Sequence, residues 1–172
     1  MIAHTLKRDQ EETIESTPSV FKVAVYFLYK SQNDLRPNTS ITHLKLQKLV
    51  YYAQAWHLAI LGKRLFNERL EAWVHGPASP DLYRTYRPYG YQVITAYIHN
   101  SDVQGFSKQS LMVLDGVWQI YGDKDAKELE KLTHSEEPWL RARQDVAPDV
   151  SSDNEIYIED MKSYYSKYLK RD

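Results

Sequence analysis

The stretch THLKLQKLVYYAQAWHLAILG, residues 42–62, gives the clearest secondary-structure signal in the chain. Threonine is a favourable N-cap because its hydroxyl accepts a hydrogen bond from a backbone N–H of the first helical turn. Glycine suits the position just past a helix, where the backbone often turns left-handed. The sequence therefore predicts a helix over about 43–61 that begins after Thr42 and ends at Gly62.

Mostly apolar residues lie on two sides of this predicted helix. One arc of the helical wheel holds Leu46, Leu49, Val50, Ala53, Trp56, His57 and Ile60. A second stripe holds Lys48, Tyr52, Ala55 and Ala59, where small alanines allow another element to approach closely. The pattern predicts a central helix that is contacted on both sides.

The flanking segments predict a second helix and a hairpin. Thr17-Pro18 forms a helix start, and the apolar SVFKVAVYFLYK that follows predicts a buried helix, with a buried strand as the alternative. Beyond the central helix, residues 64–75 place short apolar pieces around a polar centre. This arrangement predicts a small β-hairpin, followed by a turn at Gly76-Pro77.

The rest of the chain predicts further short helices. Ser79 is expected to cap one helix with Pro80 at its first position, and Ser107 to cap another that ends before Gly122. Residues 126–132 and 158–169 are expected to be helical. Ser135 is expected to cap a further helix with Pro138 at its third position. We expect a mainly α fold: one compact helical domain over 17–172 with a minor hairpin, preceded by a flexible N-terminal arm at 1–16.

Composition narrows the class of protein. The 172 residues include 14 tyrosines but only 4 phenylalanines, and a tyrosine ring tolerates a half-exposed position at an interface or at the edge of a core. The absence of cysteine excludes disulfides and thiolate zinc sites and fits a cytoplasmic protein. The N-terminus lacks a signal-peptide pattern, and the longest apolar run, Val23–Tyr29, is too short for a bilayer, so no membrane partner is expected.

Charge is distributed unevenly along the chain. Residues 41–90 hold seven Lys/Arg against three Asp/Glu, whereas residues 122–160 hold five against twelve. Two such regions suit a charged protein partner, or they face each other within the fold. The net charge of −1 argues against general nucleic-acid binding.

The sequence contains no recognisable catalytic constellation. His43 and His57 are too far apart on one helix to share an ion, and His57 is expected to be a hydrogen-bonded core residue. No paired metal-binding histidines, nucleophile elbow or phosphate loop occurs, and Ser135 beside His134 is more simply a cap. We therefore expect no catalytic residue, no metal and no cofactor.

Three separated motifs resemble the Panacea domain family, which includes SocA-like and phage-associated GepA-like proteins. The residues that match are Leu44, Leu46, Lys48, Leu49 and Tyr51–Tyr52; then Glu71, Ala72, Trp73, Gly76 and Pro77; then Thr133, His134, Pro138 and Trp139. The resemblance extends from about residue 20 to residue 168, and Ala78 departs from it mildly where a β-branched residue is usual.

This resemblance implies an antitoxin that neutralises a cognate toxin, encoded by the adjacent gene, through direct binding. Rigid aromatic and arginine residues in WVHGPASPDLYRTYRPYG (73–90) are typical interface anchors. A set of motif and neighbouring residues is expected either to line a common binding groove or to serve only as scaffold. These residues are Lys48, Tyr52, Trp73, His75, Gly76, Pro77, Tyr83, Tyr86, His134 and Trp139.

Two further hypotheses remain open at this stage. One is a prophage-associated metal-dependent hydrolase that uses His75 and His134. The other is an adaptor that delivers a bound partner to an ATP-dependent protease, which adds a protease or a chaperone to the expected partners.

Overall fold

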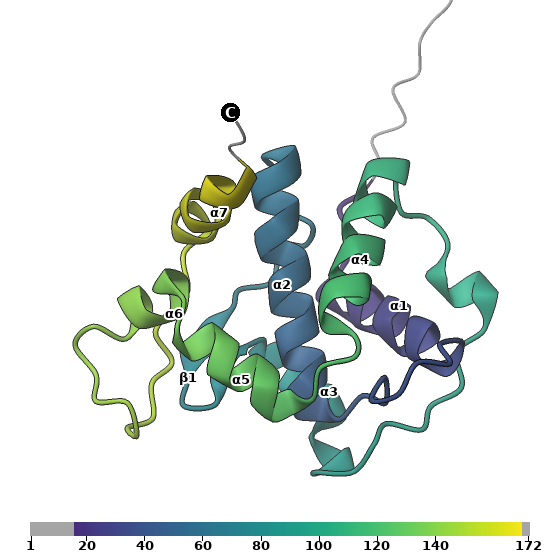
Figure 1. Ribbon diagram of the computed structural model, residues 1–172, viewed down its shortest axis with the longest axis horizontal. Helices are drawn as coiled ribbons and strands as arrows, with labels where there is room; N and C mark the ends of the chain where they lie inside the picture. Colours follow the sequence, from purple (N-terminus) through teal and green to yellow (C-terminus); the bar gives the residue numbers. More distant parts are fainter. Residues whose placement is uncertain (1–15, 170–172) are drawn as a thin grey trace, which may run out of the picture.

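The computed structural model describes residues 16–169 and shows a mainly helical fold with one small hairpin, as predicted (Figure 1). The predicted arm at 1–16 lies outside the described residues except for Ser16. The elements are α1 (Val20–Gln32), α2 (His43–Leu61), β1 (Glu71–Trp73), β2 (Gly76–Ala78), α3 (Pro80–Tyr86), α4 (Lys108–Tyr121), α5 (Ala126–His134), α6 (Glu137–Ala142) and α7 (Ile158–Ser166), with 3₁₀ turns at Arg87–Tyr89, Asn100–Val103 and Lys167–Leu169.

Helix α2 runs through the centre of the molecule, with α7 and α6 on one side and α4 and α1 on the other (Figure 1). Its predicted limits are confirmed: the Thr42 side chain accepts a hydrogen bond from the Lys45 N–H, and Gly62 adopts a left-handed φ of 72°. Fourteen of its 19 residues are buried, so the helix is enclosed more completely than two stripes suggest. Ile60 is the exception within the predicted arc, because 46% of it is exposed.

Polar side chains of α2 hold the irregular segments around it. Gln54 accepts from the backbone N–H groups of Leu65 and Phe66 and donates to the Phe66 carbonyl at 2.7 Å. Gln47 binds the N–H and the carbonyl of Ser79 in the same way, at 2.7 and 3.1 Å. Each buried amide therefore satisfies backbone groups that have no partner in a helix or strand.

His57 has a structural role, as the sequence predicts. One ring nitrogen lies 2.7 Å from the Lys63 carbonyl and the other lies 2.9 Å from the Ser110 hydroxyl. Burial lowers the pKa of His57 below its ordinary value. The ring thus links the end of α2 to the start of α4.

The hairpin is confirmed, but it lies further along the chain than 64–75. Strands β1 and β2 pair antiparallel, with Glu71 opposite Ala78, and Gly76-Pro77 lies within β2 instead of forming the turn. The side-chain amide of Gln54 accepts hydrogen bonds from the backbone N–H groups of residues 65 and 66, and this segment does not form a strand. Glu71 also forms a β-bridge with Glu155, so the hairpin supports the loop before α7.

Two predicted caps are wrong. Helix α1 begins after Ser19, whose hydroxyl accepts from the Lys22 N–H, and not at Thr17-Pro18. Helix α6 follows Glu136 with Pro138 in its first turn, while the Ser135 hydroxyl donates to the Leu132 carbonyl and so belongs to the end of α5. In both cases the sequence pattern locates the first residue of the helix only to within one or two positions.

A single arginine anchors the loop between α6 and α7. Arg143 is buried, and its guanidinium donates to the carbonyls of Ala72 at 2.7 Å, Ala147 at 3.0 Å and Val150. The loop is thereby fixed against β1.

We predict that Thr42→Ala lowers the free energy of unfolding by about 1 kcal/mol, because the first turn of α2 loses its side-chain cap. Urea denaturation followed by circular dichroism measures the change. Thr42→Ser keeps the hydroxyl and should remain close to wild type. An equal loss in both variants would show that the cap is not the cause.

Candidate functional site

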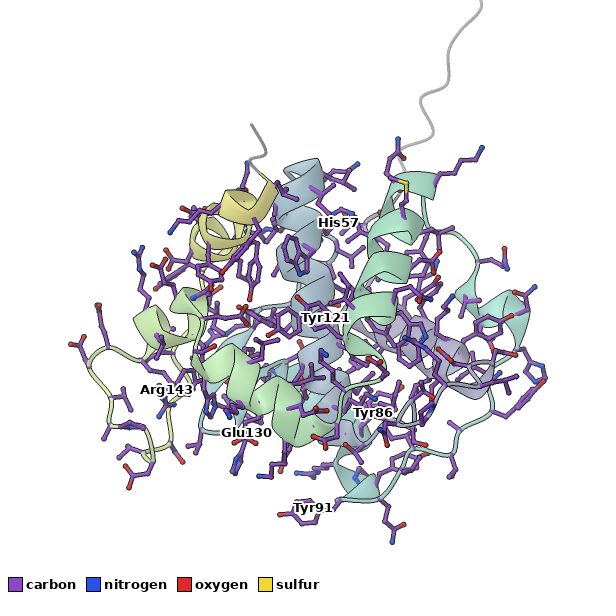
Figure 2. The ribbon with its side chains drawn as sticks, in the orientation of Figure 1. His57, Tyr86, Tyr91, Tyr121, Glu130 and Arg143 are labelled. Carbon is purple, nitrogen blue, oxygen red and sulfur yellow. The ribbon has the colours of Figure 1, made fainter. Side chains whose placement is uncertain are left out.

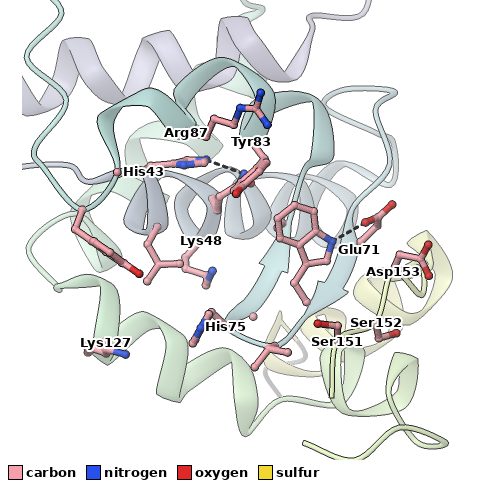
Figure 3. Close-up of a pocket in the computed structure, with 18 residues that line it drawn as sticks. His43, Lys48, Glu71, His75, Tyr83, Arg87, Lys127, Ser151, Ser152 and Asp153 are labelled. Carbon is pink, nitrogen blue, oxygen red and sulfur yellow. Dashed lines mark hydrogen bonds between the residues drawn. The ribbon is translucent and has the colours of Figure 1, made fainter. Parts of the chain in front are cut away.

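A cleft of about 1020 Å³ opens where the first half of α2, the hairpin, α3 and the loop at 151–153 come together (Figure 3). Five of the ten residues predicted for a groove line this cleft: Lys48, Trp73, His75, Gly76 and Tyr83. Their part in binding is still a prediction, but the fold brings them to one place from three separate segments.

Lys48 lies at the bottom of the cleft. Only 1% of the residue is exposed, and its ammonium donates to the Pro77 carbonyl at a long 3.4 Å. Burial lowers the pKa of Lys48 to about 7, although the negative charge of Glu130 partly offsets this effect. The site therefore contains an amine that gains or loses its charge near neutral pH.

Gly76 provides the space that Lys48 occupies. A Cβ at this position would lie 2.6 Å from Lys48 Cε and 2.9 Å from Thr133 Oγ1, closer than real side chains approach. The backbone also has a φ of 105°, which glycine adopts without strain. Glycine at the first position of the Gly-Pro motif is thus favoured both by its backbone angle and by a lysine 28 residues earlier in the chain.

Aromatic side chains form one wall of the cleft. The Trp73 ring meets the Tyr83 ring edge-on with centroids 5.1 Å apart, and the His43 ring lies 5.4 Å from Tyr83 on its other side. Trp73 Nε1 donates to Glu71 at 2.5 Å, and Glu71 also pairs with Arg69 at 3.0 Å. The indole is therefore fixed, while Tyr83 remains 40% exposed and available for contact.

The remaining predicted residues lie around the cleft and do not line it. Tyr52 is buried, stacks on Tyr121 with ring centroids 4.0 Å apart (Figure 2 shows Tyr121 between α2 and α4), and donates to Glu136 at 2.5 Å. Tyr86 packs near His43 and Tyr89.

The Thr-His-x-x-x-Pro-Trp motif supports the hairpin. Trp139 Nε1 donates to the Trp73 carbonyl at 2.8 Å, and the His134 ring stacks on Trp139 at 4.0 Å. Burial lowers the pKa of His134, and its Nε2 has no hydrogen-bond partner among the described residues. Pro77 contributes its carbonyl to Lys48 from within β2.

Several cleft residues were not predicted. They are His43, Leu44, Gln47, Glu71, Val74, Ala78, Arg87, Gly90, Tyr91, Lys127, Ser151, Ser152 and Asp153. Leu44 was within reach of the sequence pattern, since a spacing of four places it beside Lys48 on α2, and the same spacing places His43 beside Gln47. The loop at 151–153 gave no signal, because its position depends on Arg143 and on the β-bridge at Glu71.

The basic and acidic regions meet within the fold. His75 of the first region lies 3.1 Å from Glu130 of the second, and Arg69 donates to the Asp153 carbonyl at 3.1 Å. None of the ion pairs among residues 16–169 joins a Lys or Arg of 41–90 to an Asp or Glu of 122–160, so these contacts do not decide between the two explanations for the uneven charge. The lysine and arginine side chains that line the cleft are Lys48, Arg87 and Lys127.

Within residues 16–169, no three His, Asp or Glu side chains are grouped so that they could hold a metal ion. The hydrolase hypothesis with His75 and His134 therefore has no set of ligands there. Within the same residues, no helix has the length and apolar character needed to cross a membrane.

The model of one protein family, described as antitoxin SocA-like, Panacea domain, matches residues 46–140. This span is more than half of the chain and contains nearly all of the motif residues that build and support the cleft. The chain belongs to this family. No curated protein and no solved structure matches it.

We predict that Gly76→Ala destabilises the fold more than Gly90→Ala by at least about 1 kcal/mol. Both glycines have positive φ, and that strain costs about 1–3 kcal/mol, but a Cβ clashes only at Gly76. Chemical denaturation of both variants measures the difference. Adding Lys48→Ala to Gly76→Ala should recover part of the loss, and additive effects would contradict the proposed clash.

We also predict that Lys48→Met raises stability most at low pH. Below pH 7 the buried ammonium opposes folding fully, because its pKa is about 7 when folded against 10.5 as the ordinary value. Between pH 7 and 10 the unfolded chain binds more protons, so the wild type gains stability as pH rises and the advantage of the variant shrinks. Guanidinium unfolding at pH 6, 8 and 10 tests this, and a constant difference would contradict it.

Proposed function

We propose that this protein is an antitoxin that binds a cognate toxin directly and covers the surface through which the toxin acts. The family is named for an antitoxin, and this chain carries the motifs of that family. We further propose that the toxin is encoded by the adjacent gene, that the encounter takes place in the cytoplasm, and that no catalytic step is involved.

One observation supports the cleft as the place of contact. Motif residues from α2 and the hairpin line it directly, and those from α5 and α6 fix the hairpin from behind. The exposed Tyr83 beside a fixed Trp73 has the character of an interface anchor, because aromatic rings bury a large area at small entropic cost. A standard interface buries about 1,600 Å² in total, so the contact would extend beyond the cleft.

The adaptor hypothesis shares this contact and differs in its consequence. A protein that delivers its partner to an ATP-dependent protease shortens the lifetime of that partner, whereas occlusion leaves the lifetime unchanged. Partner turnover with and without the protease separates the two mechanisms. We favour occlusion because it requires only the surface described above.

The proposal predicts that co-expression with the product of the adjacent gene restores growth and that the two proteins co-purify. Within that assay, Tyr83→Ala should weaken binding by about 2 kcal/mol, roughly 30-fold, if Tyr83 is an anchor. Isothermal titration calorimetry measures the affinity. Failure of both rescue and co-purification would refute the antitoxin proposal itself.

Tyr97→Ala is the matched control. Tyr97 is 75% exposed and does not line the cleft, so its removal should leave the affinity unchanged. Circular dichroism of both variants checks that the fold is retained. Equal losses in the two variants would contradict the cleft as the contact site but would leave the antitoxin proposal standing.

A further inference from the structure

Two buried lysines of α2 differ in how well their ammonium groups are satisfied. Lys45 is 2% exposed and donates to the carbonyls of Asn38 at 2.8 Å and Gly122 at 2.6 Å. Lys48 is 1% exposed and has a single long bond of 3.4 Å to Pro77. An ammonium has three N–H donors, and leaving them unpaired in a buried site is costly. The fold therefore supplies the Lys45 ammonium with two close acceptors but supplies the Lys48 ammonium with only one distant acceptor.

The charged groups near Lys48 do not complete its bonding. No carboxylate among residues 16–169 lies within ion-pair distance of the Lys48 amine. Glu130 on α5 is the nearest source of negative charge, but it is engaged by His75 at 3.1 Å and Lys127 at 3.5 Å. The other titratable groups that influence or face this amine are His43 on α2, His134 on α5 and His75 between the two strands of the hairpin.

Lys48 lines the cleft although only 1% of the residue is exposed, and in Figure 3 its side chain extends from α2 toward the hairpin and His75. The carboxylate of Glu71 is held by Trp73 and Arg69 and so does not compete for it. Contact with an anion in the cleft therefore requires a shift of the flexible Lys48 side chain, and the buried surroundings strengthen the attraction between opposite charges.

The dimensions and walls of the cleft favour a polypeptide segment over a small free anion. A volume of about 1020 Å³ far exceeds a single carboxylate. The cleft extends from Arg87 and Tyr91 on one side of the hairpin to Ser151 and Asp153 on the other, so a chain can pass across it. The aromatic wall of Trp73 and Tyr83 suits the apolar parts of such a segment.

We infer that the cleft binds a segment of the partner protein by placing an aspartate or glutamate side chain of that segment against the amine of Lys48. This inference rests on the proposed function, since it names the chemical group of the partner that the cleft recognises. A side chain is favoured over a C-terminal carboxylate because the lining of the cleft continues on both sides of Lys48, to Lys127 on one side and to Asp153 on the other (Figure 3). The carboxylate supplies the acceptor that Lys48 lacks in the free protein.

The first test uses acetate as the probe on the full chain, with lysine ¹³C-labelled and Lys48 assigned by comparison with Lys48→Met. Acetate should shift the Lys48 ¹³Cε resonance in a saturable way, and sodium chloride at equal ionic strength should not. Above pH 7 binding requires uptake of a proton by Lys48, so the affinity should fall by up to about tenfold per pH unit. An unchanged Lys48 resonance would overturn the inference.

Three capped peptides distinguish the source of the carboxylate. Acetyl-Gly-Glu-Gly-amide should shift the Lys48 resonance as acetate does, and acetyl-Gly-Gln-Gly-amide should not. Acetyl-Gly-Gln-Gly with a free C-terminus carries only a terminal carboxylate. Binding of this third peptide without binding of the first would overturn the choice of a side chain.

Affinity measurements and the growth assay together link Lys48 to the partner protein. Lys48→Met should reduce the affinity for the product of the adjacent gene by at least tenfold, and Lys45→Met, corrected for any loss of folded protein, should not. If wild type and Lys48→Met rescue equally, the inference fails and the antitoxin proposal stands. If the wild type itself gives neither rescue nor co-purification, the antitoxin proposal fails.

Discussion

The structure depends on the way the polar side chains of one buried helix bind backbone groups of the segments around it. A helix that is enclosed on nearly every side must pair each polar atom that it buries. In α2, Gln54 fixes the start of the segment after the helix and Gln47 fixes the start of α3, while His57 joins the helix to α4. The same residues that look out of place in an apolar helix thus position the hairpin and α3.

Lys48 is the member of this set that the fold does not satisfy. Its amine crosses the space left by Gly76 and stops in the cleft, short of any carboxylate. The glycine, the lysine and the indole of Trp73 belong to one arrangement, because Trp139 fixes the hairpin at the Trp73 carbonyl. The family motifs therefore divide between two parts of the cleft: those in α5 and α6 hold its wall, and those in α2 and β2 shape its floor.

Local signals in the sequence predicted much of the fold. Thr42 and Gly62 define α2 through contacts within a few residues, and Ser79 and Ser107 do the same for α3 and α4. The hairpin begins later in the chain than predicted because the side-chain amide of Gln54, on α2, accepts a hydrogen bond from the backbone of Leu65. A pattern of local residue types does not reveal this contact. Lys48 and Trp73, which line the candidate cleft, were predicted through the family resemblance. The loop at 151–153 was missed because its place depends on tertiary contacts. Tyr52 is buried and does not line the cleft, and a buried tyrosine and an interface tyrosine look alike in sequence.

The attachment of the loop between α6 and α7 has an evolutionary consequence. Arg143 holds that loop through the carbonyl oxygens of Ala147 and Val150, which every amino acid possesses, so this attachment does not depend on which side chains stand at these two positions. The outer border of the cleft can then change its chemistry from one lineage to the next while keeping its course. The border of the cleft can thus vary in chemistry while the interior of the fold stays the same.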